Sequence, residues 1–350
     1  MKKVKILLLC LTMTLAFTAC GTSGDSESTG TDDSIYKDIE SVVLVAEDST
    51  AQGAAGQLWG EYVAKRVAEL TEGKLTIDYH PNGELGGDSD LLRQNISGDI
   101  DIVVCQTAPV VSFIPEMAVF DLPMVFSVYN AEEIDNAINE DNEFSESLGE
   151  AYENQGLQLL GFLQNATYRL TTANKPLRTL EDFKGLQIRT MENANHMAFW
   201  TAIGAEPTPL AWAEVYMALQ NGTIDAQENA ADTCYSANFQ DVQKYLCLTN
   251  HILYCNQMCI NKDTYDSLDD LYKEALDTAV SEATAYVKDM LLEMDEENKS
   301  KLEEAGMEII EYENYELYDE IMELYGVKEL YVKIDDDTNG LASKLFDALG

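Results

Sequence analysis

The sequence predicts an α/β protein of two lobes, with the chain crossing between the lobes more than once. Strand and helix patterns alternate as β-α-β-α-β over residues 41–105, an order that is typical of a largely parallel sheet covered by helices. A second series of such patterns begins near Gly156. Residues 41–350 contain no repeat and no long linker, so two lobes that share the chain fit better than two independent domains.

In the first unit, the spacing of apolar residues defines each element. The run SVVLVA is β-branched and indicates a buried strand. Helical spacing follows until Gly73, and a turn at Pro81-Asn82-Gly83 separates the next strand from the second helix. The expected strands are residues 41–46, 74–79 and 100–105, and the expected helices are residues 51–70 and 88–98.

The second unit continues the alternation with shorter elements. The expected strands are residues 157–163, 168–173, 186–190, 224–228, 245–249, 253–260 and 307–312. The expected helices are residues 179–184, 193–203 and 212–220, and a long, acidic, amphipathic helix from 265 to about 305. The tail that follows is mostly helical.

Composition excludes several classes of protein. The 350 residues carry 22 Lys+Arg against 63 Asp+Glu, a formal net charge of −41. A nucleic-acid binder needs a basic stripe, and an electrostatic membrane binder needs a basic patch, so both classes are excluded. A hydrophobic content of 46% argues against disorder. The seven Cys are scattered without a CxxC pair, so neither a zinc module nor a disulfide scaffold is indicated.

The N-terminus has the pattern of a secretory signal. Three lysines precede an apolar run over residues 6–17, and Thr18-Ala19-Cys20 follows. This pattern resembles a bacterial lipoprotein signal, with Phe17 where Leu is usual, and the resemblance implies that Cys20 becomes the lipidated first residue. We expect residues 1–19 to be the signal peptide and residues 20–40 a flexible tether, so that the protein works outside the cytoplasm on a lipid anchor. Ordinary secretion is the alternative.

Motifs for covalent or metal chemistry are absent from the sequence. It contains no HExxH, GxSxG, GxxxxGK or GxGxxG, and we therefore expect no metal, no cofactor and no enzymatic activity. Residues 335–340 resemble half of a calcium loop, but Phe346 stands at the twelfth position, so a solvated turn is the better interpretation. The remaining cysteines are expected to be small buried hydrophobes, with a disulfide as the alternative: Cys105, Cys234, Cys247, Cys255 and Cys259.

Arginine is scarce, and its placement suggests a binding site. Arg66 and Arg93 lie on expected helices at the surface, and Arg178 lies in a loop, but Arg169 and Arg189 lie on short strands. Ligands bind at strand ends in open α/β sheets, and guanidinium matches a carboxylate with two parallel hydrogen bonds. In so negative a protein, anion capture needs a local, oriented cation. The alternative is that each arginine pairs with an internal acid.

Two further residues, Asn229 and Trp212, could each have either a binding role or a purely structural one. Asn229 ends the strand that begins at 224, where it either donates to a carboxylate or caps the next helix. Trp212 follows Pro207-Thr208-Pro209 and either walls a pocket or packs in the core.

Several spaced segments resemble one known family. The runs LQIR (186–189), GAEPTPLAWAEVY (204–216), ALQNG (218–222) and IDAQEN (224–229) are similar to the solute-binding proteins of TRAP transporters, dicarboxylate-binding (DctP) type. Residues 119–123 and 249–253 also look like family segments, and the similarity extends from about 42 to beyond 265.

The resemblance implies a two-lobed, periplasmic-binding-protein-like (type II-like) fold with a cleft between the lobes and a long lobe-spanning helix. Lobe I would comprise residues 41–166 and about 255–294, and lobe II about 167–254 and 295–350. The resemblance also implies a mechanism without covalent chemistry, in which the lobes close on the ligand and the closed form docks on a membrane permease.

The resemblance also assigns roles to individual residues. Arg189 would take the ligand carboxylate in a bidentate pair, with Arg169 as a second cation and Asn229 as a donor. Trp212, where the family commonly has Phe, would stack on the carbon face of the ligand. The polar groups that would select the ligand or border the pocket are Asp48, Asp88, Gln106 and Glu228.

The expected ligand is a small organic acid. Trp212 and the polar set favour a monocarboxylate sugar acid such as a uronate or aldonate, and a C4-dicarboxylate or an aromatic acid is the alternative. We expect a monomer that delivers this acid to a TRAP-type permease. Three rival functions stay open: a component that presents ligand to a signalling receptor, an extracytoplasmic sugar-acid enzyme, and a scaffold or adhesin.

Overall fold

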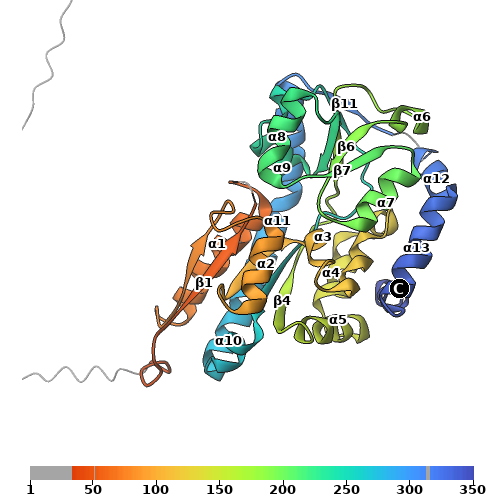
Figure 1. Ribbon diagram of the computed structural model, residues 1–350. Coiled ribbons are helices and arrows are strands. Elements are labelled where there is room, and N and C mark those ends of the chain that lie inside the picture. Colours follow the sequence, from red (N-terminus) through yellow and green to blue (C-terminus); the bar gives the residue numbers. More distant parts are fainter. Residues whose placement is uncertain (1–33, 51, 313–315) are drawn as a thin grey trace, which may run out of the picture.

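The computed structural model describes residues 34–50, 52–312 and 316–350. The predicted signal peptide, Cys20 and most of the predicted tether lie outside the described residues. Two α/β lobes, each built on one mixed sheet, make up the molecule (Figure 1). Within the described residues, no helix combines the length and the apolar character that a membrane crossing requires.

The first sheet has five strands in the order β2-β1-β3-β10-β4. Its strands are β1 (Val42–Asp48), β2 (Leu75–His80), β3 (Ile102–Gln106), β4 (Leu157–Leu163) and β10 (Asn256–Asn261). Strand β1 pairs in parallel with β2 and with β3, which confirms the parallel arrangement predicted for the start of the chain. Strand β10 is antiparallel to both β3 and β4, so the chain returns to this sheet after building most of the other one.

The second sheet has six strands in the order β11-β9-β5-β8-β6-β7. They are β5 (Leu170–Ala173), β6 (Gln187–Thr190), β7 (Glu206–Pro209), β8 (Ala226–Asn229), β9 (Tyr245–Cys247) and β11 (Glu308–Ile310). Strand β6 runs parallel to β7 and β8, whereas β5 is antiparallel to β8 and β9. The carboxyl ends of β6 and β8 therefore meet at one edge, where a ligand site is expected.

Helices cover both sheets. In chain order they are α1 (Ala55–Leu70), α2 (Asp88–Ser97), α3 (Thr107–Val110), α4 (Ala131–Asn139), α5 (Glu143–Glu153), α6 (Leu180–Phe183), α7 (Ala194–Ala202), α8 (Trp212–Asn221), α9 (Ala231–Ser236), α10 (Lys262–Ser267), α11 (Asp270–Glu304), α12 (Glu316–Glu323), α13 (Tyr325–Asp337) and α14 (Leu341–Leu349). Helices α4 and α5 were not predicted, although each begins with a capping box, at Asn130 and Asn142.

The long helix predicted for residues 265–305 is two helices in the structure. Helix α10 ends at Ser267, and Asp269 then caps α11 by accepting a hydrogen bond from the Leu271 amide at 2.9 Å. Helix α11 has 35 residues, and at ~1.5 Å per residue it is about 52 Å long. It packs against α1 and β4 of the first lobe and against α9 of the second, so it spans both.

Two more contacts tie the lobes together. Helix α13 packs against α7, whereas α14 packs against α4 and α5, so the C-terminal segment touches elements beside both sheets. Helix α1 has Ala54 at its N-cap and no side-chain cap there, but Asp232 of α9 accepts a hydrogen bond from the Ala55 amide at 3.1 Å. The assignment of residues 295–350 to lobe II stays a prediction.

All five cysteines in the described part of the chain are free and buried. This confirms the expectation of small buried hydrophobes and rules out the disulfide alternative for them. Burial raises the pKa of each thiol, to about 12 for Cys234 and Cys259.

Candidate functional site

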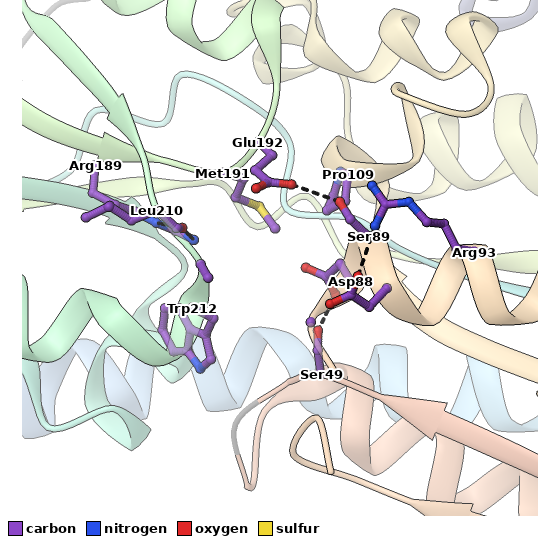
Figure 2. A pocket seen from close by; sticks show the side chains of 13 residues that line it. Ser49, Asp88, Ser89, Arg93, Pro109, Arg189, Met191, Glu192, Leu210 and Trp212 are labelled. Carbon is purple, nitrogen blue, oxygen red and sulfur yellow. Dashed lines mark hydrogen bonds and ion pairs between the residues drawn. The ribbon is translucent and has the colours of Figure 1, made fainter. Parts of the chain in front are cut away.

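A cavity of about 230 Å³ lies between the N-terminal end of α2 on one side and the ends of β6 and β7 on the other (Figure 2). A narrower cavity of about 20 Å³ continues from it toward the sheets. The two share Ser49, Asp88, Arg189, Met191 and Trp212, so they form one cleft with a wide mouth and a narrow inner end. Each lobe supplies one wall, because Ser49 and Asp88 come from the first lobe and the other three from the second.

Arg189 is a buried cation inside this cleft. It lies on β6, and its side chain is 3% exposed. Its Nε and Nη2 donate to the Leu210 carbonyl at 3.0 and 2.8 Å, which fixes the guanidinium plane, and its guanidinium lies 5.9 Å from the Trp212 ring centroid.

Arg189 has no acid in direct contact with it among the described residues, although Glu228, Asp88 and Glu192 lie near enough to favour its charge. Burial lowers its pKa to about 10. Among residues 34–50, 52–312 and 316–350, no carboxylate forms an ion pair with Arg189, so the alternative of an internal partner is wrong for this residue. An unpaired, oriented and desolvated guanidinium is what capture of a carboxylate requires.

Arg169, in contrast, is paired inside the protein. Its Nε and Nη2 donate to the Glu228 carboxylate, the second at 2.9 Å, and its Nη1 donates to Gln106 Oε1. Neither Arg169 nor Glu228 lines the cavity. The alternative of an internal acid therefore holds for Arg169. It reaches the cleft through lining residues of the narrow end, because it donates to Gln106 and, at 3.3 Å, to Asn229 Oδ1.

Glu228 belongs to a buried charged cluster behind the cleft. Its carboxylate lies 3.3 Å from His251 Nε2 and 3.7 Å from His196 Nδ1, and His196 Nε2 lies 3.1 Å from Asp121. Burial raises the pKa of Glu228, but Arg169 and the histidines outweigh it, and the net pKa lies well below the ordinary value. Burial opposes the charge on His196, but Asp121 and Glu228 raise its pKa to about 9.

Asn229 and Trp212 both line the cleft. Helix α9 begins after Ala230 without a side-chain cap, so Asn229 does not cap it, and that alternative is wrong. The Asn229 Nδ2 donates to Gln227 at 2.8 Å. Trp212 is half-buried and meets Phe239 edge to face at 5.7 Å between ring centroids, which leaves part of the ring toward the cavity.

Asp88 lines the opposite wall, whereas Asp48 does not line the cleft. Ser49 Oγ donates to Asp88, and burial raises the pKa of Asp88. Asp48 is fully buried and accepts hydrogen bonds from the Tyr79 hydroxyl and from Thr50 Oγ1, the latter at 2.6 Å. Burial raises the pKa of Asp48 to about 6, and its contacts hold the turn that carries Ser49.

The sequence prediction missed several residues at the mouth of the cleft. Arg93 was placed at the surface and is 62% exposed there, but it also lines the cavity, and it donates to Asp90 at 2.9 Å. Ser89 Oγ donates to Glu192 at 3.0 Å, a hydrogen bond that joins the two walls (Figure 2). Glu192 lies three positions after Arg189, in the loop that follows β6. This short distance from the predicted binding residue was the signal that could have placed Glu192 at the cleft.

Two α/β lobes with a cleft between them, and an unpaired buried arginine within the cleft, define the class of two-lobed solute-binding proteins. A family model described as "Bacterial extracellular solute-binding protein, family 7" (DctP) matches residues 45–326. The chain therefore belongs to this family, the DctP-type solute-binding proteins of TRAP transporters.

Curated relatives and solved structures agree with this assignment. The 2,3-diketo-L-gulonate-binding periplasmic protein YiaO of Escherichia coli is 30% identical over 246 residues, which covers 70% of this chain and 73% of the relative. The sialic acid-binding periplasmic protein SiaP of Vibrio cholerae is 31% identical over 62% of this chain and 67% of its own length. The sugar acid binding protein DctPAm of Advenella mimigardefordensis, solved with galactonate, has a TM-score of 0.81 at 26% identity, over 89% of this chain and 99% of its own.

Proposed function

We propose that this chain captures a monocarboxylate sugar acid, an aldonate or a uronate, and delivers it to the membrane permease of a TRAP transporter. The observation that carries the proposal is Arg189, a buried cation in the cleft that forms no ion pair with any acid among the described residues. Similar proteins support the ligand class: the Advenella structure holds galactonate, and a TRAP solute-binding protein of Sulfitobacter, 25% identical, holds galacturonate.

In this proposal, each cleft residue has a distinct task. Arg189 pairs with the carboxylate in bidentate geometry, and Asn229 donates to the same group. The Trp212 ring packs on the C–H face of the ligand. Asp88 and Gln106 meet its hydroxyl groups, whereas Arg169, Glu228 and Asp48 act behind the cleft by holding Gln106 and the turn at Ser49.

The proposal extends to location and chemistry. The mature protein is a monomer outside the cytoplasm, anchored through a lipid on Cys20, and it returns its ligand unchanged. Cells that express the wild-type protein or Cys20→Ser are grown with labelled palmitate. Label in the wild-type protein alone supports the lipid anchor, whereas equal labelling of both proteins refutes it. Recovery of a chemically altered acid after incubation with the pure protein, detected by NMR, refutes simple binding.

A thermal-shift screen of an organic-acid library tests the ligand class. A ligand at a hundred times its Kd stabilises the folded state by ~2.7 kcal/mol, a clear rise in Tm. We expect aldonates or uronates to raise Tm in the wild-type protein and to leave Arg189→Lys unshifted. Failure of every acid to shift the wild-type protein refutes the proposed function.

A further inference from the structure

One hydrogen bond crosses the mouth of the cleft. The Ser89 hydroxyl, in the first turn of α2, donates to the Glu192 carboxylate at 3.0 Å, and Glu192 lies on the opposite wall in the loop that follows β6 (Figure 2). Both residues line the wide cavity and neither lines the narrow inner one. Glu192 is exposed, whereas Arg189 is buried, so this contact narrows the opening through which a ligand reaches Arg189.

The backbone on each side of this contact is held in place. Met191 and Asn193, which flank Glu192, are both buried, and the Asn193 side chain donates to the Ala108 carbonyl of α3 at 2.9 Å. Ser89 is the second residue of α2, so its backbone is fixed by the helix. The exposed Glu192 side chain, in contrast, can turn away from Ser89 without movement of the chain, and exposed side chains rotate within nanoseconds.

Two interactions draw the Glu192 carboxylate over the cleft. One is the hydrogen bond from Ser89. The other is attraction to Arg189: burial lowers the pKa of Arg189, and Glu192 is among the acids that raise it. In the part of the chain that the structure describes, no Lys or Arg forms an ion pair with Glu192, so no cation holds this carboxylate away from the mouth.

We infer that Ser89 and Glu192 form a gate across the mouth of the cleft, which slows both the entry and the release of the ligand. A ligand passes only while the hydrogen bond is broken, in either direction, so loss of the gate raises kon and koff together and changes Kd less. A residue that only contacts the bound ligand acts differently, because its loss raises koff and Kd. The inference rests on the proposed function, since it assumes that the ligand travels to Arg189.

Stopped-flow fluorescence with galactonate tests the gate, and Trp212, which lines the cleft, supplies the signal. If the thermal-shift screen selects another acid, that acid replaces galactonate. Loss of a typical hydrogen bond changes an equilibrium by a factor of about 2–10. Ser89→Ala should therefore raise kon and koff by at least ~3-fold each and change Kd by less than either rate. Ser89→Thr keeps the hydroxyl and should restore both wild-type rates.

Two further variants assign the effect to this contact. Glu192→Ala removes the other half of the gate, so the addition of Ser89→Ala to it should change neither rate further. Ser97→Ala removes an exposed hydroxyl at the far end of α2 and should leave both rates unchanged.

The results that overturn the gate differ from those that overturn the proposed function. Wild-type rates in Ser89→Ala, a rise of koff and Kd alone, or a further rise of both rates when Ser89→Ala is added to Glu192→Ala overturns the gate and leaves carboxylate capture standing. A wild-type protein that binds no acid overturns both.

Discussion

Replacement of Arg189 by alanine should cost the protein most of its affinity. In the structure, two of its nitrogens donate to Leu210, and it forms no ion pair with an acid among the described residues, so in the proposed complex the ligand carboxylate is its direct partner. Loss of one partner of a buried, hydrogen-bonded charge pair costs about 2–5 kcal/mol. Because ~1.4 kcal/mol is a tenfold change in Kd, the expected loss is about 30-fold to 4,000-fold.

Isothermal titration with the best ligand of the screen measures this loss. Arg189→Lys should also fail, since an ammonium cannot form the two parallel hydrogen bonds. Arg178→Ala removes an exposed arginine that pairs with Glu308 and should bind normally, which controls for the loss of one positive charge. Arg189→Lys that folds and keeps wild-type affinity refutes the reasoning.

Three more outcomes follow from the site. Trp212→Ala should weaken binding by ~10-fold, whereas Trp212→Phe should keep most of the affinity, as calorimetry will measure; equal loss in both contradicts stacking. Glu228→Gln should lower the free energy of unfolding by about 3–5 kcal/mol in urea titrations, because Arg169 is left buried without its counter-charge. The folded-state pKa of His196, about 9, lies above its unfolded value, so its contribution to stability is complete below pH ~6.5 and is lost as the pH rises through 9. His196→Gln should flatten the dependence of Tm on pH in that window, and an unchanged slope contradicts the role of its charge.

Hydrophobic spacing was enough to predict most elements of the fold. Strand β4 has the predicted bounds, because five of its seven residues are Leu or Phe and it directly follows Gly156. Strand β7 was missed because Pro207 and Pro209 lack amide hydrogens and argue against a strand. In the structure, β7 is an edge strand that pairs only with β6. Prolines are tolerated at the edge of a sheet, because one side of the strand forms no ladder hydrogen bonds.

The site was predicted less completely than the fold, since sequence does not show which acids face which cations. Arg169 and Arg189 looked alike, each on a short strand. Glu228 reaches Arg169 from 59 positions away because β8 pairs antiparallel with β5, a pairing that only the sheet order reveals. Arg93 was expected on a helix at the surface, and the structure confirms this. The sequence of α2 alone, however, does not show that this helix lies at the cleft.

The contact between Asp232 and α1 provides a natural reporter of cleft opening. The first turn of any helix leaves amide hydrogens without partners, and here the acceptor for Ala55 comes from the opposite lobe. Separation of the lobes exposes this amide to water, whereas closure protects it. Deuterium uptake at Ala55 therefore measures how often the empty protein opens, with no attached fluorophore or spin label.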